Sequence, residues 1–155
     1  MGAAPDHLGR AIDIAVDSAT SGGGPFGCVV VTADGRAFEG RNEVVALCDP
    51  SAHAEIQAVR AACAALGEPA LPGATVYASA EPCPMCFAAL HWAGVESVIF
   101  AATPAQAADA GFDDTAISGI ATGETVDPIP FVHVPRANSD APFAAWRSNP
   151  DRAEY

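Results

Sequence analysis

The chain carries few basic residues. Seven Lys plus Arg stand against 19 Asp plus Glu in 155 residues, which gives a formal net charge of −12. An acidic surface repels phosphate backbones, and no Lys/Arg cluster offsets this, so we expect no nucleic-acid partner. No apolar run approaches the roughly 20 residues that a membrane helix needs, so we expect no membrane partner. No basic segment leads into an apolar run after Met1, and we therefore expect no signal peptide and a cytoplasmic location.

A disulfide framework is also missing. The five cysteines are an odd number, and Cys83 and Cys86 have the Cys-x-x-Cys spacing of a metal site. A thioredoxin-like redox role for this pair is the alternative, and the upstream His-x-Glu makes it the weaker one. Cys28 and Cys63 lie in apolar sequence, which favours buried, unreactive thiols.

Helices and strands alternate along most of the chain. We predict helices over 6–19, 52–66 and 83–93, with Asp6 and Ser51 as N-caps. Shorter helices are expected at 104–110 and 142–147, and 111–130 is expected to be irregular. The segments that favour strands are 26–32, 37–47, 75–79 and 95–101, the first two joined by a turn at Asp34-Gly35.

This order defines the expected fold class. Strands separated by helices require crossovers, so the sheet is at least partly parallel. We predict an α/β protein, a three-layer α/β/α sandwich whose central mixed sheet has about five strands. No linker divides the chain, so residues 1–155 form one domain. Residues 131–155 lack strong periodicity and read as a C-terminal extension.

Two short motifs carry the chemistry. His53-Ala54-Glu55 is followed by Pro82-Cys83-Pro84-Met85-Cys86. Zinc prefers nitrogen and sulfur ligands in a tetrahedron, and catalytic sites use three protein ligands and one water. Three such ligands are available in His53, Cys83 and Cys86, and each lies near the start of a helix. The helix dipole there favours the thiolate form of the two cysteines. We therefore predict one Zn²⁺ per chain.

Glu55 is predicted to be the catalytic acid–base. It is two residues from His53, so it does not share that residue's helix face and is not a fourth ligand. Zinc lowers the pKa of bound water to about 7, and Glu55 can take its proton and return it to the substrate. The alternative is a solvated first-turn carboxylate.

A structural zinc site is the competing interpretation of the same ligands. It would need a fourth ligand, and Cys28, Cys48, Cys63 and the remaining His lack suitable spacing. A non-catalytic, zinc-stabilised binding module would follow from such a site. Glu55 argues against it, because a closed metal site has no use for a nearby carboxylate.

The two motifs resemble those of the cytidine deaminase superfamily, whose H-x-E…P-C-x-x-C pattern they match. The chain also resembles the bacterial guanine deaminases within it, from about Gly24 to Tyr155. That likeness depends on scattered segments: Gly24-Pro25-Phe26-Gly27, Asn42, Asp49-Pro50, Trp92, Gly111-Phe112-Asp113-Asp114, Pro142-Phe143-Ala144-Ala145-Trp146 and Glu154-Tyr155.

The resemblance implies three polar contacts with a purine. Asn42 would hydrogen-bond the base, the backbone N–H of Ala54 would donate to its carbonyl, and Asp114 would bind the exocyclic amine and help to move protons. Alternatives remain for two of them. Asn42 could satisfy backbone in a turn at the strand edge, and Asp114 could cap a helix that begins near Thr115.

The resemblance also implies an apolar lining and a dimer. Phe26 and Trp92 would line the pocket, and Tyr155 would complete the partner's site in a homodimer whose C-terminal segments are swapped. The alternatives are plain core positions for Phe26 and Trp92 and a frayed end for Tyr155. Ala80 and Cys48 depart from the family pattern, which leaves the exact substrate open.

We therefore expect hydrolytic deamination of a free purine base, most simply guanine to xanthine plus ammonia, in purine catabolism. Attack at C2 would be assisted by Glu55 protonating N3 and by Asp114 at the leaving amine. Guanosine, cytosine or an aminated s-triazine are alternative substrates with the same zinc chemistry. A tRNA adenosine deaminase is a weaker alternative, because it would want basic residues.

Overall fold

The computed structural model describes residues 5–152. The chain begins with α1 (His7–Thr20), and Asp6 caps it as predicted, since the Gly9 N–H donates to the Asp6 carboxylate at 2.8 Å. An acidic side chain here satisfies one of the backbone donors that a helix start leaves without a partner. No helix in the described part of the chain is long and apolar enough to cross a membrane.

One mixed sheet forms the centre of the molecule. Its strands are β1 (Gly27–Val31), β2 (Ala37–Arg41), β3 (Thr75–Ala80) and β4 (Ser97–Ala102), in the order β2-β1-β3-β4. β1 is antiparallel to β2 and β3, and β3 is parallel to β4. The expected strand count of about five is wrong: residues 5–152 contain four strands. After β4 the chain turns into a helix and does not return to the sheet.

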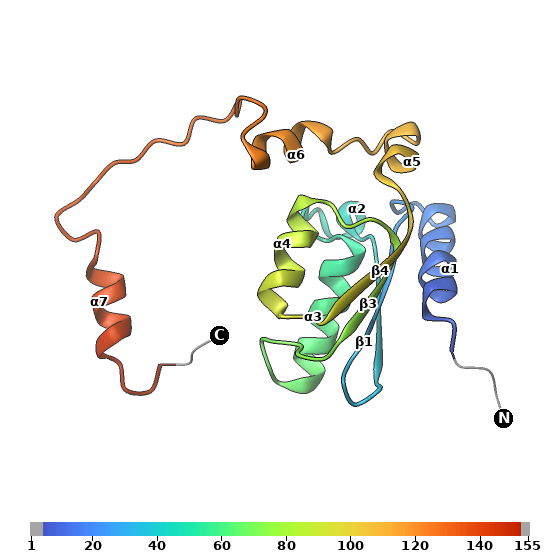
Figure 1. The fold of residues 1–155 in the computed structure, drawn as a ribbon, viewed down its shortest axis with the longest axis horizontal. Helices are drawn as coiled ribbons and strands as arrows, with labels where there is room; N and C mark the ends of the chain where they lie inside the picture. The colour runs from blue at the N-terminus through green and yellow to red at the C-terminus, as the bar shows by residue number, and fades with distance from the viewer. Residues whose placement is uncertain (1–4, 153–155) are drawn as a thin grey trace.

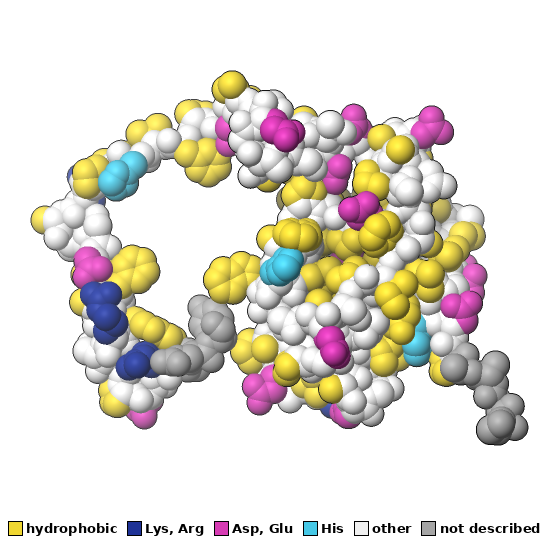
Figure 2. All heavy atoms as spheres, viewed as in Figure 1, with side chains coloured by type: hydrophobic (Ala, Val, Ile, Leu, Met, Phe, Trp, Pro, Cys, Tyr) yellow, Lys and Arg dark blue, Asp and Glu magenta, His cyan; other side chains and the backbone are white. Residues whose placement is uncertain are grey.

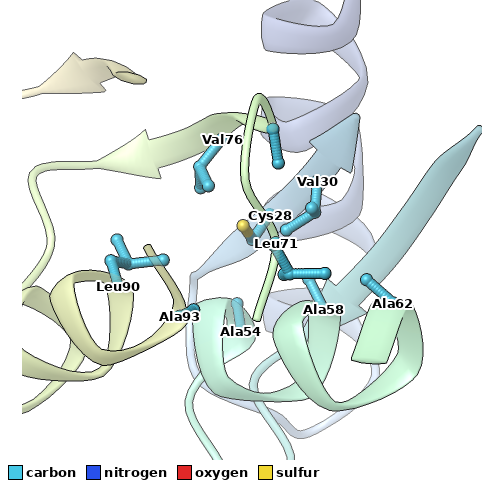
Figure 3. Close-up of a cluster of buried hydrophobic side chains, with 10 residues drawn as sticks. Cys28, Val30, Ala54, Ala58, Ala62, Leu71, Val76, Leu90 and Ala93 are labelled. Atoms are coloured by element: carbon cyan, nitrogen blue, oxygen red, sulfur yellow. The ribbon is translucent and has the colours of Figure 1, made fainter. Parts of the chain in front are cut away.

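Helices cover both faces of this sheet, so the predicted α/β/α sandwich is confirmed. α1 packs on one face, and α3 (Ala54–Leu66) and α4 (Pro84–Ala93) lie on the other (Figure 1). The core between the sheet and α3/α4 consists of buried apolar side chains. Figure 3 shows Cys28 and Val30 of β1 and Val76 of β3 facing Ala58 and Leu90. The thiol of Cys28 is fully buried there, as the sequence predicts.

Two predicted boundaries between β2 and α3 are wrong. β2 ends at Arg41, and the short helix α2 (Val44–Leu47) replaces the rest of the expected strand, because the Glu43 N–H donates to Ala52 O at 2.9 Å and closes a loop. The N-cap of α3 is His53 rather than Ser51. The Ser51 hydroxyl instead donates to the Asp49 carboxylate at 2.7 Å.

The chain beyond β4 forms three short helices. They are α5 (Pro104–Asp109), α6 (Thr115–Thr122) and α7 (Ala141–Ser148). α6 lies inside the stretch expected to be irregular, so that prediction is wrong for residues 115–122. The helix begins at Thr115, the start that the capping alternative for Asp114 implied. Residues 123–152, here called the C-terminal arm, leave the body and curve around it at a distance (Figure 1). None of them is buried.

Candidate metal centre and substrate site

Three side chains from two helices meet at the end of the sheet where β2 and β3 finish. His53 Nδ1 lies 3.5 Å from Cys83 Sγ and 3.5 Å from Cys86 Sγ. All three ligand atoms lie within 4.8 Å of one another. Zn–N bonds of about 2.0 Å and Zn–S bonds of about 2.3 Å at tetrahedral angles place N and S roughly 3.5 Å apart. The cluster therefore has the dimensions of a tetrahedral zinc site.

Helix starts place these ligands. His53 is the N-cap of α3 and Cys83 is the N-cap of α4, both with extended backbone angles, and Pro84 occupies the first turn of α4. Cys86 follows within that turn and is buried. The positive end of each helix dipole thus faces the cluster, and it favours the thiolates that bind a metal.

The charges of the cluster are coupled. Hydrogen bonds from Cys86 and His53 lower the pKa of the Cys83 thiol to about 4. The hydrogen bond with Cys83 raises the pKa of His53, and the same neighbour together with burial raises the pKa of Cys86. Of the two thiols, Cys83 therefore has the lowered pKa and is the more readily ionised. Metal binding must release the protons that Cys86 and His53 hold.

The ligand set is open rather than closed. Among the described residues, no fourth Cys, His, Asp or Glu joins this cluster. Cys28 belongs to the core, Cys48 is exposed on α2, and Cys63 is partly buried toward the end of α3. His53, Cys83 and Cys86 form a candidate zinc site. Three protein ligands are the number that catalytic zinc sites use, with water at the fourth position.

Glu55 lies beside the ligands in the first turn of α3. It is 7% exposed, and His53, Cys83 and Cys86 all act on its carboxyl group. Burial raises the pKa of Glu55, since a charged carboxylate loses its hydration there. The solvated carboxylate considered as an alternative does not describe this side chain. A buried carboxyl with a raised pKa beside a metal site is suited to accept and return a proton.

Two of the expected purine contacts come from the end of β2 and the start of α3, two elements that pack against each other. Asn42 follows β2 and is 8% exposed; its Oδ1 accepts a hydrogen bond from the Val44 N–H at 3.4 Å. This is the turn contact that the sequence left as an alternative, and it engages the oxygen of the amide rather than the nitrogen. Ala54 is the first residue of α3, so its N–H is one of the donors without an intrahelical partner.

Asp113 and Asp114 divide two roles at the start of α6. The Asp113 carboxylate accepts hydrogen bonds from Thr115 N at 2.9 Å and from Thr115 Oγ1 at 2.5 Å. These bonds lower the pKa of Asp113. Asp114 is the N-cap residue by position, but its side chain makes no capping hydrogen bond. Asp113 therefore holds the turn, and the carboxylate of Asp114 has no structural task in the cap.

Phe112 connects this turn to Phe26 near the start of β1. Its ring meets Phe26 edge to face, with centroids 5.0 Å apart. Phe26 precedes β1, and its carbonyl accepts from the Asn42 N–H at 3.2 Å. The two rings also border an apolar groove of about 540 Å³ between α1 and α5, which Ala80 helps to line. Sequence reasoning gave Phe112 no role, although its place next to Asp113-Asp114 was a usable signal.

Trp92 does not join this group within the described residues 5–152. Trp92 is 76% exposed near the end of α4, two turns beyond the cysteines. Tyr155 lies outside the described residues. Cys48, which departs from the family pattern, is exposed and ends α2 in the left-handed region, with φ of 51°.

The family follows from a comparison with known proteins. The model described as the cytidine and deoxycytidylate deaminase zinc-binding region matches residues 4–102, which is well over half of the chain and includes both motifs. The protein belongs to this family of zinc-binding deaminases.

Comparison with individual proteins shows which members of the family this chain is similar to. Guanine deaminase from Bacillus subtilis is 42% identical over 150 residues, which cover 96% of each chain. The X-ray structure of a guanine deaminase from Bacillus subtilis superimposes with a TM-score of 0.89 at 43% identity, again over 96% of both chains. The tRNA-specific adenosine deaminase of Agrobacterium fabrum strain C58 is 44% identical over 79 residues, covering 50% of this chain and 51% of that protein.

Proposed function

We propose that this protein is a zinc-dependent guanine deaminase that converts guanine and water to xanthine and ammonia. The observation that carries the proposal is an open three-ligand cluster beside a buried Glu55. Support comes from the likeness to guanine deaminase, which extends over 96% of the chain, whereas the likeness to the tRNA enzyme stops at about half. The net charge of −12 also disfavours an RNA substrate.

His53, Cys83 and Cys86 would hold the zinc ion, which supplies a water whose pKa falls to about 7. As water adds to C2, Glu55 would take its first proton and deliver it to N3 of guanine. Glu55 would then take the second proton from the new C2 hydroxyl and deliver it to the amine, so that the C2–N bond breaks and ammonia leaves. The raised pKa of Glu55 suits both directions of transfer, because a buried carboxyl holds its proton more firmly than an exposed one. Burial also keeps bulk water away from this exchange.

The remaining contacts orient the base. Asn42 donates from its amide nitrogen, because its oxygen already faces Val44. The N–H of Ala54 donates to the purine carbonyl at the positive end of α3. The carboxylate of Asp114 would accept a hydrogen bond from the exocyclic amine and hold it in place while ammonia forms and leaves. Phe26, held by Phe112, covers one side of the ring system.

We also propose that the enzyme is a homodimer in which the C-terminal arms are exchanged. β4 is an edge strand, and its apolar side chains stay uncovered: Val98, Ile99 and Phe100 are 37%, 42% and 41% exposed. The arm presents its own uncovered apolar residues, including Phe131 at 85% and Val132 at 77%. Both surfaces are exposed in the described chain. In a dimer, the arm of one copy would cover β4 of the other, so no further partner is needed.

Charge favours the same pairing. Three of the seven Lys plus Arg residues lie in the arm, as Arg136, Arg147 and Arg152, in a chain whose net charge is −12. Figure 2 shows the dark-blue side chains gathered on the arm and magenta acidic side chains over the body. In the exchanged dimer, Tyr155 and Trp92 would complete the pocket across the interface. A cytoplasmic location suits the five unpaired cysteines, since reducing conditions preserve thiolate ligands.

A panel of free bases tests the function. Zinc-loaded protein is offered guanine, guanosine, cytosine, adenine and ammeline, and ammonia release is measured for each. We expect guanine to give the largest kcat/KM and xanthine as its product. Glu55→Ala should keep one zinc per chain and lose at least about 100-fold in turnover. Ammonia from another base with none from guanine would contradict the substrate, and wild-type turnover by Glu55→Ala would contradict the mechanism.

A further inference from the structure

Gly40 is the point where β2 touches the start of α3. A Cβ atom added at Gly40 would lie 2.1 Å from the Ala54 backbone oxygen and 2.5 Å from the Ala58 backbone nitrogen. Contacts of a Cβ below 3.0 Å essentially do not occur, so a methyl group here would force roughly 1 Å of movement. Gly40 has no positive φ. Glycine is therefore required at this position because there is no room for a side chain, and not because of its backbone conformation.

The turn that lies on Gly40 is the turn that carries the chemistry. His53, Ala54 and Glu55 occupy consecutive positions at the start of α3. Cys83 and Cys86 come from a different helix, α4. The separation between α3 and the sheet therefore helps to set whether His53 Nδ1 reaches 3.5 Å from both sulfur atoms. Metal–ligand distances tolerate only about 0.2 Å, so a movement of about 1 Å is large on this scale.

The helix rather than the strand would move. β2 pairs with β1 at five register positions, from Gly27↔Arg41 to Val31↔Ala37. Its end is held twice more: the Asn42 N–H donates to Phe26 O at 3.2 Å, and the buried Ser18 hydroxyl donates to Asn42 O at 3.4 Å. A side chain at Gly40 would press on the backbone of α3, which no strand pairing restrains.

We propose that Gly40 is a positioning residue for the metal centre: its missing side chain lets the first turn of α3 approach the sheet closely enough to bring His53 to the two cysteines. The effect on turnover rests on the proposed function, whereas the effect on metal binding does not. Gly40→Ala should weaken zinc binding roughly tenfold to a hundredfold, the size of effect seen when groups that orient metal ligands are altered.

Gly27 provides a matched control on the other face of the sheet. A Cβ atom at Gly27 would lie 2.3 Å from Ala11 O and 2.7 Å from Ala15 N, both in the backbone of α1. The strain is therefore of the same kind and of similar size. Because α1 carries none of the zinc ligands, Gly27→Ala should lower the unfolding temperature as Gly40→Ala does and leave zinc affinity at the wild-type value.

A second pair of variants makes the test independent of whether Gly40→Ala folds. Ala58 and Ala62 are both fully buried on α3, but only Ala58 faces Gly40, and Ala62 lies one turn further from His53. Ala58→Val should weaken zinc binding in the same direction as Gly40→Ala and by less. Ala62→Val should bind zinc like the wild type, because it presses on the helix away from the metal ligands.

The experiment measures zinc affinity by competition with a chromophoric chelator, the visible spectrum of the Co²⁺-substituted protein, thermal unfolding, and guanine turnover. We expect weaker zinc binding and an altered Co²⁺ spectrum for Gly40→Ala and Ala58→Val only. Wild-type affinity in either, or an equal loss in Gly27→Ala or Ala62→Val, would overturn the proposal. If zinc affinities separate as expected but no variant or wild type deaminates guanine, the positioning role stands and the proposed function fails.

Discussion

The body of the molecule and its C-terminal arm cover their apolar side chains to opposite degrees. In the body, Val29, Val30 and Val76 are at most 1% exposed. In the arm, Val126 is 90% exposed and Phe131 is 85% exposed. Burial contributes about 25 cal/mol per Å² of apolar surface, so the body has a stabilising core and the arm as described has none. The arm therefore needs a surface supplied by something else.

This difference separates two parts of the site. The zinc ligands and Glu55 lie wholly in the body, on helices fixed by the core. Trp92, which we propose to complete the pocket across the dimer interface, is 76% exposed on α4. Changes at the zinc ligands or at Glu55 should therefore abolish metal binding or proton transfer without altering assembly. Changes in the arm should alter assembly and turnover and leave the metal in place.

Loss of a zinc ligand should have the largest effect. Cys86→Ser is expected to bind less than about 0.1 zinc per chain after dialysis against a weak chelator and to lose essentially all turnover, because two ligands hold the ion poorly. Metal analysis and xanthine formation measure this outcome. Cys63→Ser is the control, since Cys63 lies outside the cluster, and it should keep both. Stoichiometric zinc in Cys86→Ser would show that the ion is bound elsewhere.

Removal of residues 131–155 should have the next largest effect. We expect this truncation to keep one zinc per chain and to alter the sedimentation of the proposed dimer in analytical ultracentrifugation. It should also lower kcat/KM for guanine by roughly 10- to 100-fold, because the base is positioned less well. If the truncated chain has wild-type kinetics, neither the arm nor Tyr155 belongs to the site. If it loses zinc as well, the division between body and arm is wrong.

The two aspartates before α6 should then separate catalysis from stability. Asp114→Asn is expected to lower kcat about tenfold or more with little change in unfolding temperature, because its carboxylate makes no capping bond. Asp113→Asn should lower the unfolding temperature by a few degrees and leave kcat near wild type, because Asp113 holds Thr115. If Asp114→Asn instead lowers the unfolding temperature and leaves kcat near wild type, Asp114 has the capping role that the sequence left as an alternative.

The smallest effect concerns the metal-free protein. Burial raises the pKa of Glu55 in the folded state above its ordinary value of 4.5, so folding favours the protonated form. The stability from protonated Glu55 is fully present below pH 4.5 and is lost as pH rises through the folded-state pKa. Metal-free Glu55→Gln should therefore unfold at a higher temperature than metal-free wild type at pH 8, and the gap should close toward pH 4.5.

Local sequence determined the elements of the body well. Asp6 caps α1, Gly94 ends α4 in the left-handed region, and the spacing of His53, Cys83 and Cys86 predicted one cluster on two helix starts. Each of these features depends on residues a few positions apart or on one ligand geometry. Such short-range interactions can be predicted from the sequence alone.

The features that sequence reasoning missed depend on distant contacts. The cap of α3 moved to His53 because Ser51 turns to Asp49, and β2 stopped at Arg41 because Glu43 pairs with Ala52 across the loop. The contact of Phe112 with Phe26 joins residues 86 positions apart. The close approach at Gly40 appears only when a helix is laid on the strand. Only four segments of the sequence favour strands, and residues 5–152 form four strands, so the expected count of about five was wrong.

Mixed dimers test most directly that each site joins the body of one chain to the arm of another. Full-length Glu55→Gln and a chain ending at Pro130 are co-expressed with different tags, purified through both tags, and assayed for xanthine formation. Each protein alone should be nearly inactive, and the mixed dimer, with one complete site of two, should recover about half of the wild-type turnover per dimer. A mixed dimer as inactive as its parents would contradict the account.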